Sequence, residues 1–545
     1  MELLGARASD RMSAHHHIPL PMPMPMHQQH YLDAFVSLEG DVPGRLAAQR
    51  YLDASTAIYH GEVITMGFIP QVYDTQELCH FQSIADDTYA ILCKMTQRYL
   101  EDASYRALFG FSPLLEYLTL LPAGYDCLIP MIRIDLFFDR ASQQFKFCEF
   151  NTDGASAMNE DREICNALAL SPTFKKAVLD TPLYAQELFD PWVETFCALY
   201  TESCHGKDSP VVAIIDYMEK TTINELLEFR ARFEAQGVRC LICDTDALVY
   251  KNGVLYGTDI DSNETQGSTS VRIDVVYRRA VTSDIMLDLT AQGIFDPAQI
   301  EGKKDAKGSC ALIAAVRDEA VCVIGGFRTH VVHSKTAFRM LHHPATTSYL
   351  TADERQFVAD HVPYTTELTS DQLAIQPAVL TDRDRWIIKP IDGYGSVGVH
   401  AGLSFSDTEW EATIQRFVDT GYILQEYCTQ YPTPNTLPVP RNPDTTPLFD
   451  TPEAARHAEQ DLGFSARTLQ PFNVLTGLFM YGGTFRGVYI RAGMNALIVG
   501  FQGGITLGTY VCADNAAHMP GTPLPSQESY SATNISNLSV RLRHL

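Results

Sequence analysis

The chain has 545 residues, a formal net charge of -25 and 46% hydrophobic residues. This length suggests about three domains, since single domains usually hold about 100–200 residues. The acidic balance argues against nucleic acid or an anionic membrane as the main partner. No apolar run reaches the ~18 residues that a membrane span needs. The 13 cysteines show no disulfide spacing, which favours a reducing compartment, so we expect a cytoplasmic protein.

The N-terminal part is read as a leader followed by helices. Residues 1–30, with HHHIPLPMPMPMHQQH, are rich in Pro, Met and His, which predicts a disordered leader. From residue 31 to about 125 the pattern is helical, as in ELCHFQSIADDTYAILCKMTQRYL. An aromatic hairpin and further helices follow, and we group residues 31–205 as one region.

The hairpin is predicted from the runs MIRIDLFFD and FKFCEFN, which flank the polar turn DRASQQ. With the turn centred near Ser142, Asp135 faces Glu149. In the same register Arg133 faces Asn151, and all four polar side chains project from one face. The opposite face is apolar and consists of Ile132, Ile134, Leu136, Phe138, Cys148 and Phe150.

The polar face of the hairpin suits a divalent cation. Two carboxylates directly across a ladder repel each other, and a cation between them removes the repulsion. Carboxylate and amide oxygens are ligands that Mg²⁺ prefers, and Arg133 beside them suits a phosphate or a developing oxyanion. The alternative is a solvated hairpin face with a cross-strand salt bridge.

Residues 206–330 predict a parallel α/β unit, Rossmann-like in outline, from the order strand (PVVAIIDYM), helix (TINELLEFRARFEAQG), strand (VRCLICD) and strand (VRIDVVYRRA). No GxGxxG is present, so we assign no dinucleotide. Cys240 and Cys243 lie in a predicted strand and point to opposite faces, which argues against a metal site. For Arg278 and Arg279, surface salt bridges are favoured over contact with an acidic substrate.

The stretch WIIKPIDGYGSVGV, within a region taken as 331–513, predicts a phosphate-binding element. Lys389 ends a strand, and a loop with Gly393, Gly395 and Ser396 follows. Glycines let backbone N–H groups approach phosphate oxygens, and the lysine supplies charge. The lysine precedes the glycines, so this is not a Walker A loop. A lysine beside an ordinary turn is the alternative.

Other features of this region complete the pattern. Lys335 sits just before a helix start in HSKTAFRMLHH. The strand YILQEYC is expected to line an adenine slot with backbone groups of Gln425, Glu426 and Tyr427, although an edge strand has the same pattern. A Pro-rich insert near 431–465 is predicted to be an exposed loop, and residues 514–545 a flexible tail.

In this order, RID, EFN, SK, IIKP with its glycine loop, LQEY and GLFMYGGTFRGVYIRAG resemble the glutathionylspermidine synthase family over roughly residues 115 to 510. The resemblance implies an α/β (α+β) ATP-grasp fold in circularly permuted order, with metal ligands early and ATP lysines late. The Rossmann-like unit would then be the pre-ATP-grasp domain. The N-terminal part does not resemble the amidase of bifunctional members, so we expect the synthetase part only.

The resemblance also assigns roles. The residues matched to Mg²⁺ are Asp135, Glu149 and Asn151. Those matched to the phosphates are Arg133, Arg491, Lys335 and Lys389, with Gly393, Gly395 and Ser396 in the loop. Gln425, Glu426 and Tyr427 match the adenine side, and Asp153 and Ser156 are substrate candidates.

The implied reaction is ADP-forming carboxylate–amine ligation through an acyl phosphate, with ATP and Mg²⁺ as cofactors. The implied partners are a small carboxylate, such as the peptide glutathione, and a polyamine-like amine. One alternative is an ATP-binding scaffold or partner subunit that has lost catalysis. Another is a Rossmann-like oxidoreductase on residues 210–330, against which the missing glycine fingerprint counts.

Overall fold

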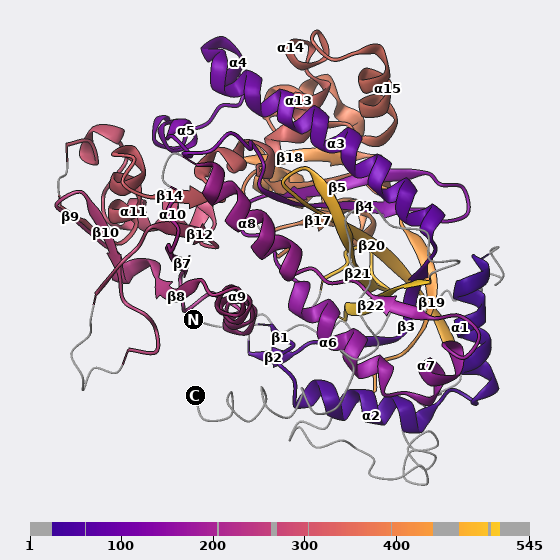
Figure 1. Ribbon diagram of the computed structural model, residues 1–545. Coiled ribbons are helices and arrows are strands. Elements are labelled where there is room, and N and C mark those ends of the chain that lie inside the picture. Colours follow the sequence, from indigo (N-terminus) through magenta and orange to yellow (C-terminus); the bar gives the residue numbers. More distant parts are fainter. Residues whose placement is uncertain are drawn as a thin grey trace, which may run out of the picture.

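The computed structural model describes residues 24–59, 61–203, 206–262, 270–302, 305–393, 395–439, 468–499 and 503–512 (Figure 1). The predicted tail, most of the predicted leader and the later part of the Pro-rich insert lie outside these residues. The helices are α1 Met26–Ser37, α2 Val42–Asp53, α3 Thr75–Glu101, α4 Ala103–Ala107, α5 Pro113–Leu120, α6 Met158–Ala169, α7 Pro172–Ala177, α8 Asp190–Glu202, α9 Ile223–Ala235, α10 Thr282–Ala291, α11 Gly308–Arg317, α12 His330–His333, α13 Thr336–His342, α14 Pro344–Thr347, α15 Ala352–His361, α16 Ser370–Ile375 and α17 Asp407–Phe417.

The largest sheet joins the two ends of the described chain. Its strand order is β3-β22-β21-β20-β4-β5, and β19 and β6 pair at its margins. The strands are β3 Met66–Tyr73, β4 Met131–Phe138, β5 Phe145–Asn151, β6 Leu183–Ala185, β19 Tyr431–Thr436, β20 Leu469–Tyr481, β21 Thr484–Gly493 and β22 Ile505–Cys512. Strands β3 and β22 pair in parallel, so the first long strand and the last one lie side by side.

Helix α3 covers this sheet because one of its faces is apolar. It begins with a capping box in which the Asp74 carboxylate accepts from the Glu77 backbone N–H, an arrangement that satisfies free donors at a helix start. The helix packs against β20 and β21. Its buried residues recur at helical spacing and include Leu78, Phe81, Ile84, Ile91, Met95 and Tyr99.

The hairpin β4–β5 has the predicted register, with Asp135 opposite Glu149 and Arg133 opposite Asn151. A bulge follows, because Leu136 pairs with Phe147 and leaves Cys148 as the extra residue. A one-residue insertion reverses the alternation of side chains. The prediction that Cys148 belongs to the apolar face is therefore wrong: Phe147 enters the core, and Cys148 lines a cleft.

A second sheet, at the left of Figure 1, is parallel and has the order β14-β12-β7-β8. Its strands are β7 Val211–Asp216, β8 Arg239–Asp244, β12 Val275–Arg278 and β14 Cys322–Ile324. Cys240 and Cys243 of β8 enter separate cores on its two faces, as the alternation predicts. The twelve cysteines of the described residues are all free.

A third sheet is antiparallel and has the order β15-β18-β16-β17. Its strands are β15 Thr365–Glu367, β16 Trp386–Pro390, β17 His400–Ala401 and β18 Tyr422–Glu426. Since β18 lies between β15 and β16, the edge-strand alternative for this segment is wrong. The smaller strands elsewhere are β1 Ile58–Tyr59, β2 Glu62–Val63, β9 Val249–Lys251, β10 Val254–Gly257, β11 Val271–Arg272 and β13 Ala306–Lys307.

Three sequence expectations are corrected here. The region read as helical up to residue 125 contains β3, which is buried along its whole length and so shows no alternation. Helix α1 begins at Met26, so the last residues of the predicted disordered leader are helical. The Pro-rich insert begins with β19, which within the described residues pairs only with β20, so Pro432 and Pro434 break no ladder on its other side.

None of the described helices is long and apolar enough to cross a bilayer.

A buried ion pair joins the parallel sheet to the hairpin. Arg278 Nη2 of β12 lies 2.5 Å from Asp153 Oδ1, just after β5, and both side chains are at most 1% exposed. The expectation of a surface salt bridge for Arg278 is therefore wrong. Arg279, which pairs with Glu225, is likewise buried. Arg278 ends β12 and Arg279 follows it. The sequence predicts this strand but does not reveal the distant acidic partners of its arginines.

We expect Arg278→Met to lower the free energy of unfolding by about 3–5 kcal/mol, because it leaves the Asp153 carboxylate buried without its cation. Chemical denaturation measures the change. Arg385→Met is the matched control, since Arg385 and its partners are far more exposed and such pairs contribute about 1 kcal/mol or less. Equal losses in the two variants would contradict this role for Arg278.

Candidate active site

A cleft opens between the antiparallel sheet and the β4–β5–β21 part of the largest sheet. It holds about 890 Å³ of unfilled space, part of it open to solvent. The predicted site residues that line it are Asp135, Glu149, Lys335, Lys389, Gly393, Gly395, Ser396, Gln425, Glu426, Tyr427 and Arg491. Residues more than 350 positions apart in the sequence thus meet in one cleft.

The charged centre of the cleft consists of Glu149 from β5 and the lysines Lys335 and Lys389. Burial disfavours the ionised Glu149, but Lys335 and then Lys389 outweigh it and hold the pKa of Glu149 below its ordinary value. Burial lowers the pKa of Lys335, and Glu149 partly offsets this. Lys389 also donates to the Cys148 carbonyl at 3.4 Å, so the bulge places an acceptor where the lysine reaches it.

Arg133 and Asp135 form a two-contact ion pair along β4. Arg133 Nε donates to Asp135 Oδ1 at 2.7 Å, and Nη2 donates to Oδ2 at 2.9 Å. Asn151 Nδ2 also donates to Asp135 Oδ2, at 3.0 Å. Burial raises the pKa of Asp135 even beside Arg133. Arg133 and Asp135 are buried and closely paired, and Glu149 and Asn151 are half-buried, so the alternative of a solvated face is wrong for the β4 side of the hairpin.

The donor set fits Mg²⁺ in chemistry, with two opposed carboxylates and an amide oxygen. Within the described residues no group of three or more His, Cys, Asp or Glu side chains forms a metal site. An ion here would therefore depend on Glu149, Asp135, Asn151 and further oxygens from a ligand and water. Both Asp135 oxygens are engaged by Arg133, so Asp135 would have to share or exchange that contact.

The glycine loop is tied to the cleft through Lys335, whose Nζ donates to the Gly393 carbonyl at 2.8 Å. Its backbone N–H donates to the Ile391 carbonyl at 3.1 Å. Gly393 has a φ of 152° and Gly395 a φ of 65°; the conformation of Gly395 is one that glycine adopts without a steric penalty. The lysine that contacts the glycine loop is thus Lys335, whereas Lys389, which the sequence pairs with this loop, contacts the Cys148 carbonyl.

The strand on the adenine side offers fewer groups than the sequence suggests. The backbone N–H of Glu426 donates to Tyr364, and that of Tyr427 donates to Arg385. The Gln425 side chain donates to Thr365 at 2.9 Å and is buried. The backbone N–H donors of Glu426 and Tyr427 are therefore already used within the protein.

The two substrate candidates lie outside this cleft. Asp153 is buried against Arg278, and the backbone N–H of Thr282 donates to it at 2.7 Å. The expected substrate contact of Asp153 is therefore corrected, because its carboxylate is held inside the protein. Ser156 is half-buried, and its carbonyl accepts from Arg133 Nη1 at 2.7 Å.

A second cavity adjoins the cleft and shares Gly395, Ser396, Arg491 and Ile498 with it. It contains a buried carboxylate that sequence reasoning missed, Glu160 of α6. Tyr489 Oη donates to Glu160 Oε2 at 2.5 Å, and Arg491 Nε donates to Tyr489 Oη at 3.0 Å. A carboxylate on one side and an arginine on the other thus share one tyrosine hydroxyl at the junction of the two cavities.

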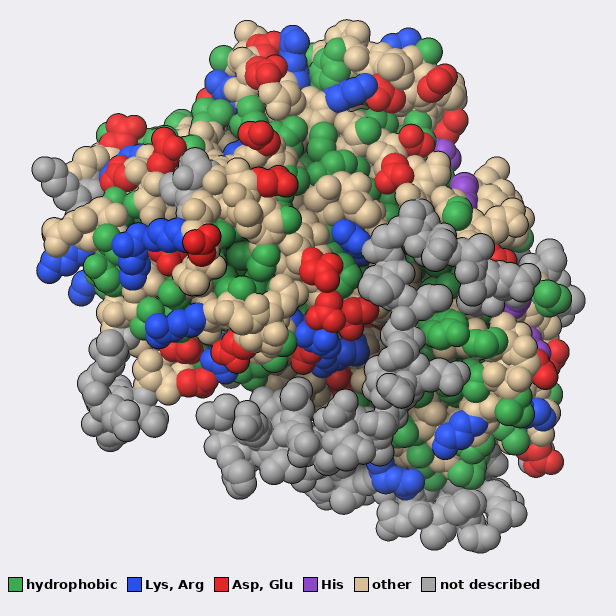
Figure 2. All heavy atoms as spheres, in the orientation of Figure 1, with side chains coloured by type: hydrophobic (Ala, Val, Ile, Leu, Met, Phe, Trp, Pro, Cys, Tyr) green, Lys and Arg blue, Asp and Glu red, His purple; other side chains and the backbone are tan. Residues whose placement is uncertain are grey.

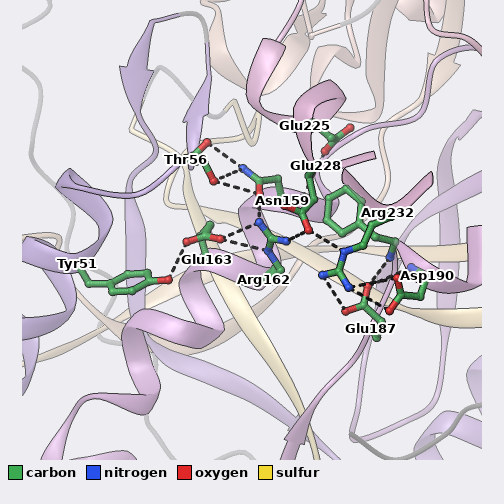
Figure 3. A network of polar contacts seen from close by, with 11 residues as sticks. Tyr51, Thr56, Asn159, Arg162, Glu163, Glu187, Asp190, Glu225, Glu228 and Arg232 are labelled. Atoms are coloured by element: carbon green, nitrogen blue, oxygen red, sulfur yellow. Dashed lines mark hydrogen bonds and ion pairs between the residues drawn. The ribbon is translucent and has the colours of Figure 1, made fainter. Parts of the chain in front are cut away.

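Helix α6 is fixed at the start by a polar network. Figure 3 shows Arg162 of α6 between Glu163 and Glu228, and Arg232 of α9 between Glu228 and acids near α8. Near the middle of the face in Figure 2, where α6 and α9 lie, acidic and basic side chains adjoin. The Glu225 carboxylate accepts from the backbone N–H groups of Ala157 and Met158 at the start of α6. The helix dipole favours an anion at this position. These contacts fix the turn of α6 that carries Glu160.

Gly477 of β20 makes room for the arginine pair. It lies directly opposite Asp135, and a Cβ there would come within 2.9 Å of Arg133 Cδ and of Asp135 Oδ1. Sequence reasoning did not single it out, although an isolated glycine in a strand pattern is a known sign of close approach.

Comparison with known proteins defines the class of fold. No protein-family model matches the chain, and no curated protein matches its sequence significantly. Solved structures do match, and a match with a TM-score above 0.5 supports the mixed α/β fold.

In particular, the structure is similar to a glutathione synthetase-like effector (GSS30) from Globodera pallida in its apo form. The TM-score is 0.52 at 10% identity, over 86% of this chain and 96% of that one. A putative gamma-glutamylcysteine synthetase from Methylobacillus flagellatus KT has a TM-score of 0.32 at 10% identity, over 85% and 96% of the two chains. D-cycloserine synthetase DcsG has a TM-score of 0.25 at 13% identity, over 60% and 99%.

We expect Gly477→Ala to lower the free energy of unfolding by about 1–3 kcal/mol, because the new methyl group displaces the Arg133–Asp135 pair. Gly493→Ala is the control, since a Cβ there meets its neighbours only at 3.7 Å or more. Thermal and chemical unfolding of both variants measure the difference. If Gly477→Ala unfolds like the wild type, the packing of Arg133 over this glycine is wrong.

Proposed function

We propose that the protein is an ATP-dependent ligase that joins a small carboxylate to an amine with release of ADP. The observation that carries the proposal is the single cleft that gathers Glu149, Lys335, Lys389 and Arg491 beside a glycine loop. The fold type supports it, because the neighbour of similar fold is described as glutathione synthetase-like. The finer family, glutathionylspermidine synthase, belongs to this proposal and rests on the sequence resemblance, as does the permuted ATP-grasp order with a Rossmann-like pre-ATP-grasp domain over 206–330.

The nucleotide would lie with its base against β18, whose Gln425 and Glu426 line the cleft, and with its phosphates toward the lysines. Lys335 and Lys389 neutralise phosphate charge in a buried setting, where electrostatic interactions are strong. The glycine loop brings backbone groups to the phosphates and limits access of water. Mg²⁺, held by Glu149, Asp135 and Asn151, supplies further positive charge when bound.

The proposed reaction consists of a phosphoryl transfer followed by an acyl transfer. A substrate carboxylate oxygen bonds to the γ-phosphorus of ATP and ADP leaves; the amine nitrogen then bonds to the acyl carbon, and inorganic phosphate leaves. The protein needs no nucleophile of its own, so its residues act by position and charge. We assign Arg133 and Arg491 to the charge that develops on the transferred phosphoryl group.

The second cavity is our candidate for the amine side. Glu160 presents a carboxylate that attracts an ammonium group, and the neighbouring Arg491 lies at the boundary with the cleft. Under this assignment the amine enters past Tyr59 and Glu62, which line the same cavity. Glutathione and a polyamine are the pair that the sequence resemblance suggests. A cytoplasmic location fits the free cysteines of the described residues.

One observation favours a second candidate, an ATP-binding scaffold without catalysis. Both oxygens of Asp135 accept from Arg133, so one proposed metal ligand is already occupied by a cation. A scaffold would bind ATP and release no ADP in the presence of any amine.

The deciding experiment incubates the purified full-length protein with ATP, Mg²⁺ and a pool of small peptides and amines. We expect release of ADP and phosphate that depends on both substrates, with the new amide identified by mass spectrometry. ATP binding without product would establish the scaffold, and a response to NAD(P)H without ATP would overturn both.

Two variants test the charged centre. We expect Glu149→Gln to lower ADP release by at least about 100-fold, because loss of one preorganised electrostatic group in an active site has an effect of this order. Lys389→Ala should mainly weaken ATP binding, seen by titration calorimetry. Lys220→Ala is the control, since Lys220 pairs with Asp284 away from the cleft. Unchanged ATP affinity in Lys389→Ala would contradict the phosphate assignment.

A further inference from the structure

A buried histidine beside the cleft lies between two carboxylates. His330 begins α12, and its side chain is 1% exposed. Its Nδ1 is 3.7 Å from Asp153 Oδ2, and its Nε2 is 3.3 Å from Asp392 Oδ1. Neither ring nitrogen has a hydrogen-bond partner among the described residues. The contacts with Asp153 and Asp392 therefore offset the cost of burying the ring.

The two carboxylates belong to different parts of the molecule. Asp153 follows the hairpin strand β5 and is held by Arg278 of the parallel sheet. Asp392 precedes Gly393, the glycine whose carbonyl accepts from Lys335. The imidazole of His330 therefore stands between the loop after the hairpin and the start of the glycine loop.

Charge explains why a histidine occupies this place. The Asp153 side chain is buried, and that of Asp392 is 37% exposed. Two carboxylates on either side of one ring repel, and a cation between them removes this repulsion. Burial favours the neutral ring, but Asp153 and Asp392 outweigh it and raise the pKa of His330 to about 9. In contrast, burial lowers the pKa of His333 on the same helix to about 4. Of these two histidines, only His330 carries charge at neutral pH.

We propose that His330 is a positioning residue, whose imidazolium bridges Asp153 and Asp392 and so fixes the start of the glycine loop against the cleft. The effect on the loop is independent of any reaction. Its consequence for ATP rests on the proposed function, because only a nucleotide-binding loop would lose ATP affinity when released.

The first experiment is hydrogen–deuterium exchange of the free full-length protein, followed at residues 391–393 and 395–399. We expect His330→Gln to speed exchange there about tenfold, since a contact to a charged group contributes on that order. His333→Gln is the matched control, because His333 is a half-buried histidine on the same helix, and among the described residues Asp392 pairs with His330 and not with His333. Equal exchange in His330→Gln and the wild type, or equal acceleration in both variants, would overturn the proposal.

Asp392→Asn tests the bridge from its other end and keeps the proposal testable if His330→Gln does not fold. The Asp392 side chain is 37% exposed, so the change should be tolerated while the loop is released. The double variant should exchange no faster than either single variant, because contacting groups are not additive. Additive acceleration, or wild-type exchange in Asp392→Asn, would overturn the bridge.

The second experiment measures the Kd for ATP with Mg²⁺ by titration calorimetry. We expect about tenfold weaker binding in His330→Gln and Asp392→Asn, by the same charged contact, and wild-type affinity in His333→Gln. If the wild-type protein binds no ATP, the proposed function fails, while the exchange experiment still decides the bridge. If the wild-type protein binds ATP and both His330→Gln and Asp392→Asn bind it with the same Kd, the positioning role of His330 is wrong.

Discussion

The register of the β4–β5 hairpin is the constraint on which the candidate site depends. It places Asp135 opposite Glu149 at the cleft, and the bulge at Cys148 then exchanges the two faces. Without the extra residue, Phe147 would occupy the cleft side of the strand. The bulge also presents the Cys148 carbonyl to Lys389. The register therefore supplies the acidic face, and the bulge supplies the core anchor and a contact to the opposing sheet.

The charged residues in the cleft are not explained by a contribution to the stability of the fold. A buried ion pair gains back its desolvation cost only with good geometry, and apolar replacement is often neutral or stabilising. Here Glu149 faces two lysines, so the set carries an excess of positive charge inside the protein. An excess of this kind is costly unless an anion joins it. A polyphosphate is the kind of ligand that matches two lysines and Arg491 around one cleft.

The sequence predicts the parts that depend on local periodicity. The hairpin register follows from alternation, and the order of strand and helix predicts the parallel sheet. It misses β3, because a strand buried on both faces has no alternation to detect. It also misses β19, where Asn435 compensates for the prolines: its side-chain amide donates to the Ile69 carbonyl and accepts from the Ile69 N–H. Such pairing over hundreds of residues has no local signal.

The site residues show the same difference between features with a local signal in the sequence and features that depend on distant residues. The sequence singles out Lys389 and the glycine loop because a lysine and several glycines are close together in the chain, and both features line the cleft. Asp153 is misread because its partner Arg278 is distant in the sequence, and nothing near Asp153 shows that its charge is already neutralised. Glu160 and Gly477 have meaning only from what lies across the sheet or the cavity, so a single sequence offers at most a hint for either.

The charged residues behind the cleft form an alternating series from the parallel sheet to the glycine loop: Arg278, Asp153, His330 and Asp392. In a medium of low dielectric constant each member depends on its neighbours, since removal of one leaves the next uncompensated. Contacts of 2.5, 3.7 and 3.3 Å connect Arg278 to Asp392 through this series. This gives the parallel sheet, which lines neither cavity described above, a physical means to influence the glycine loop.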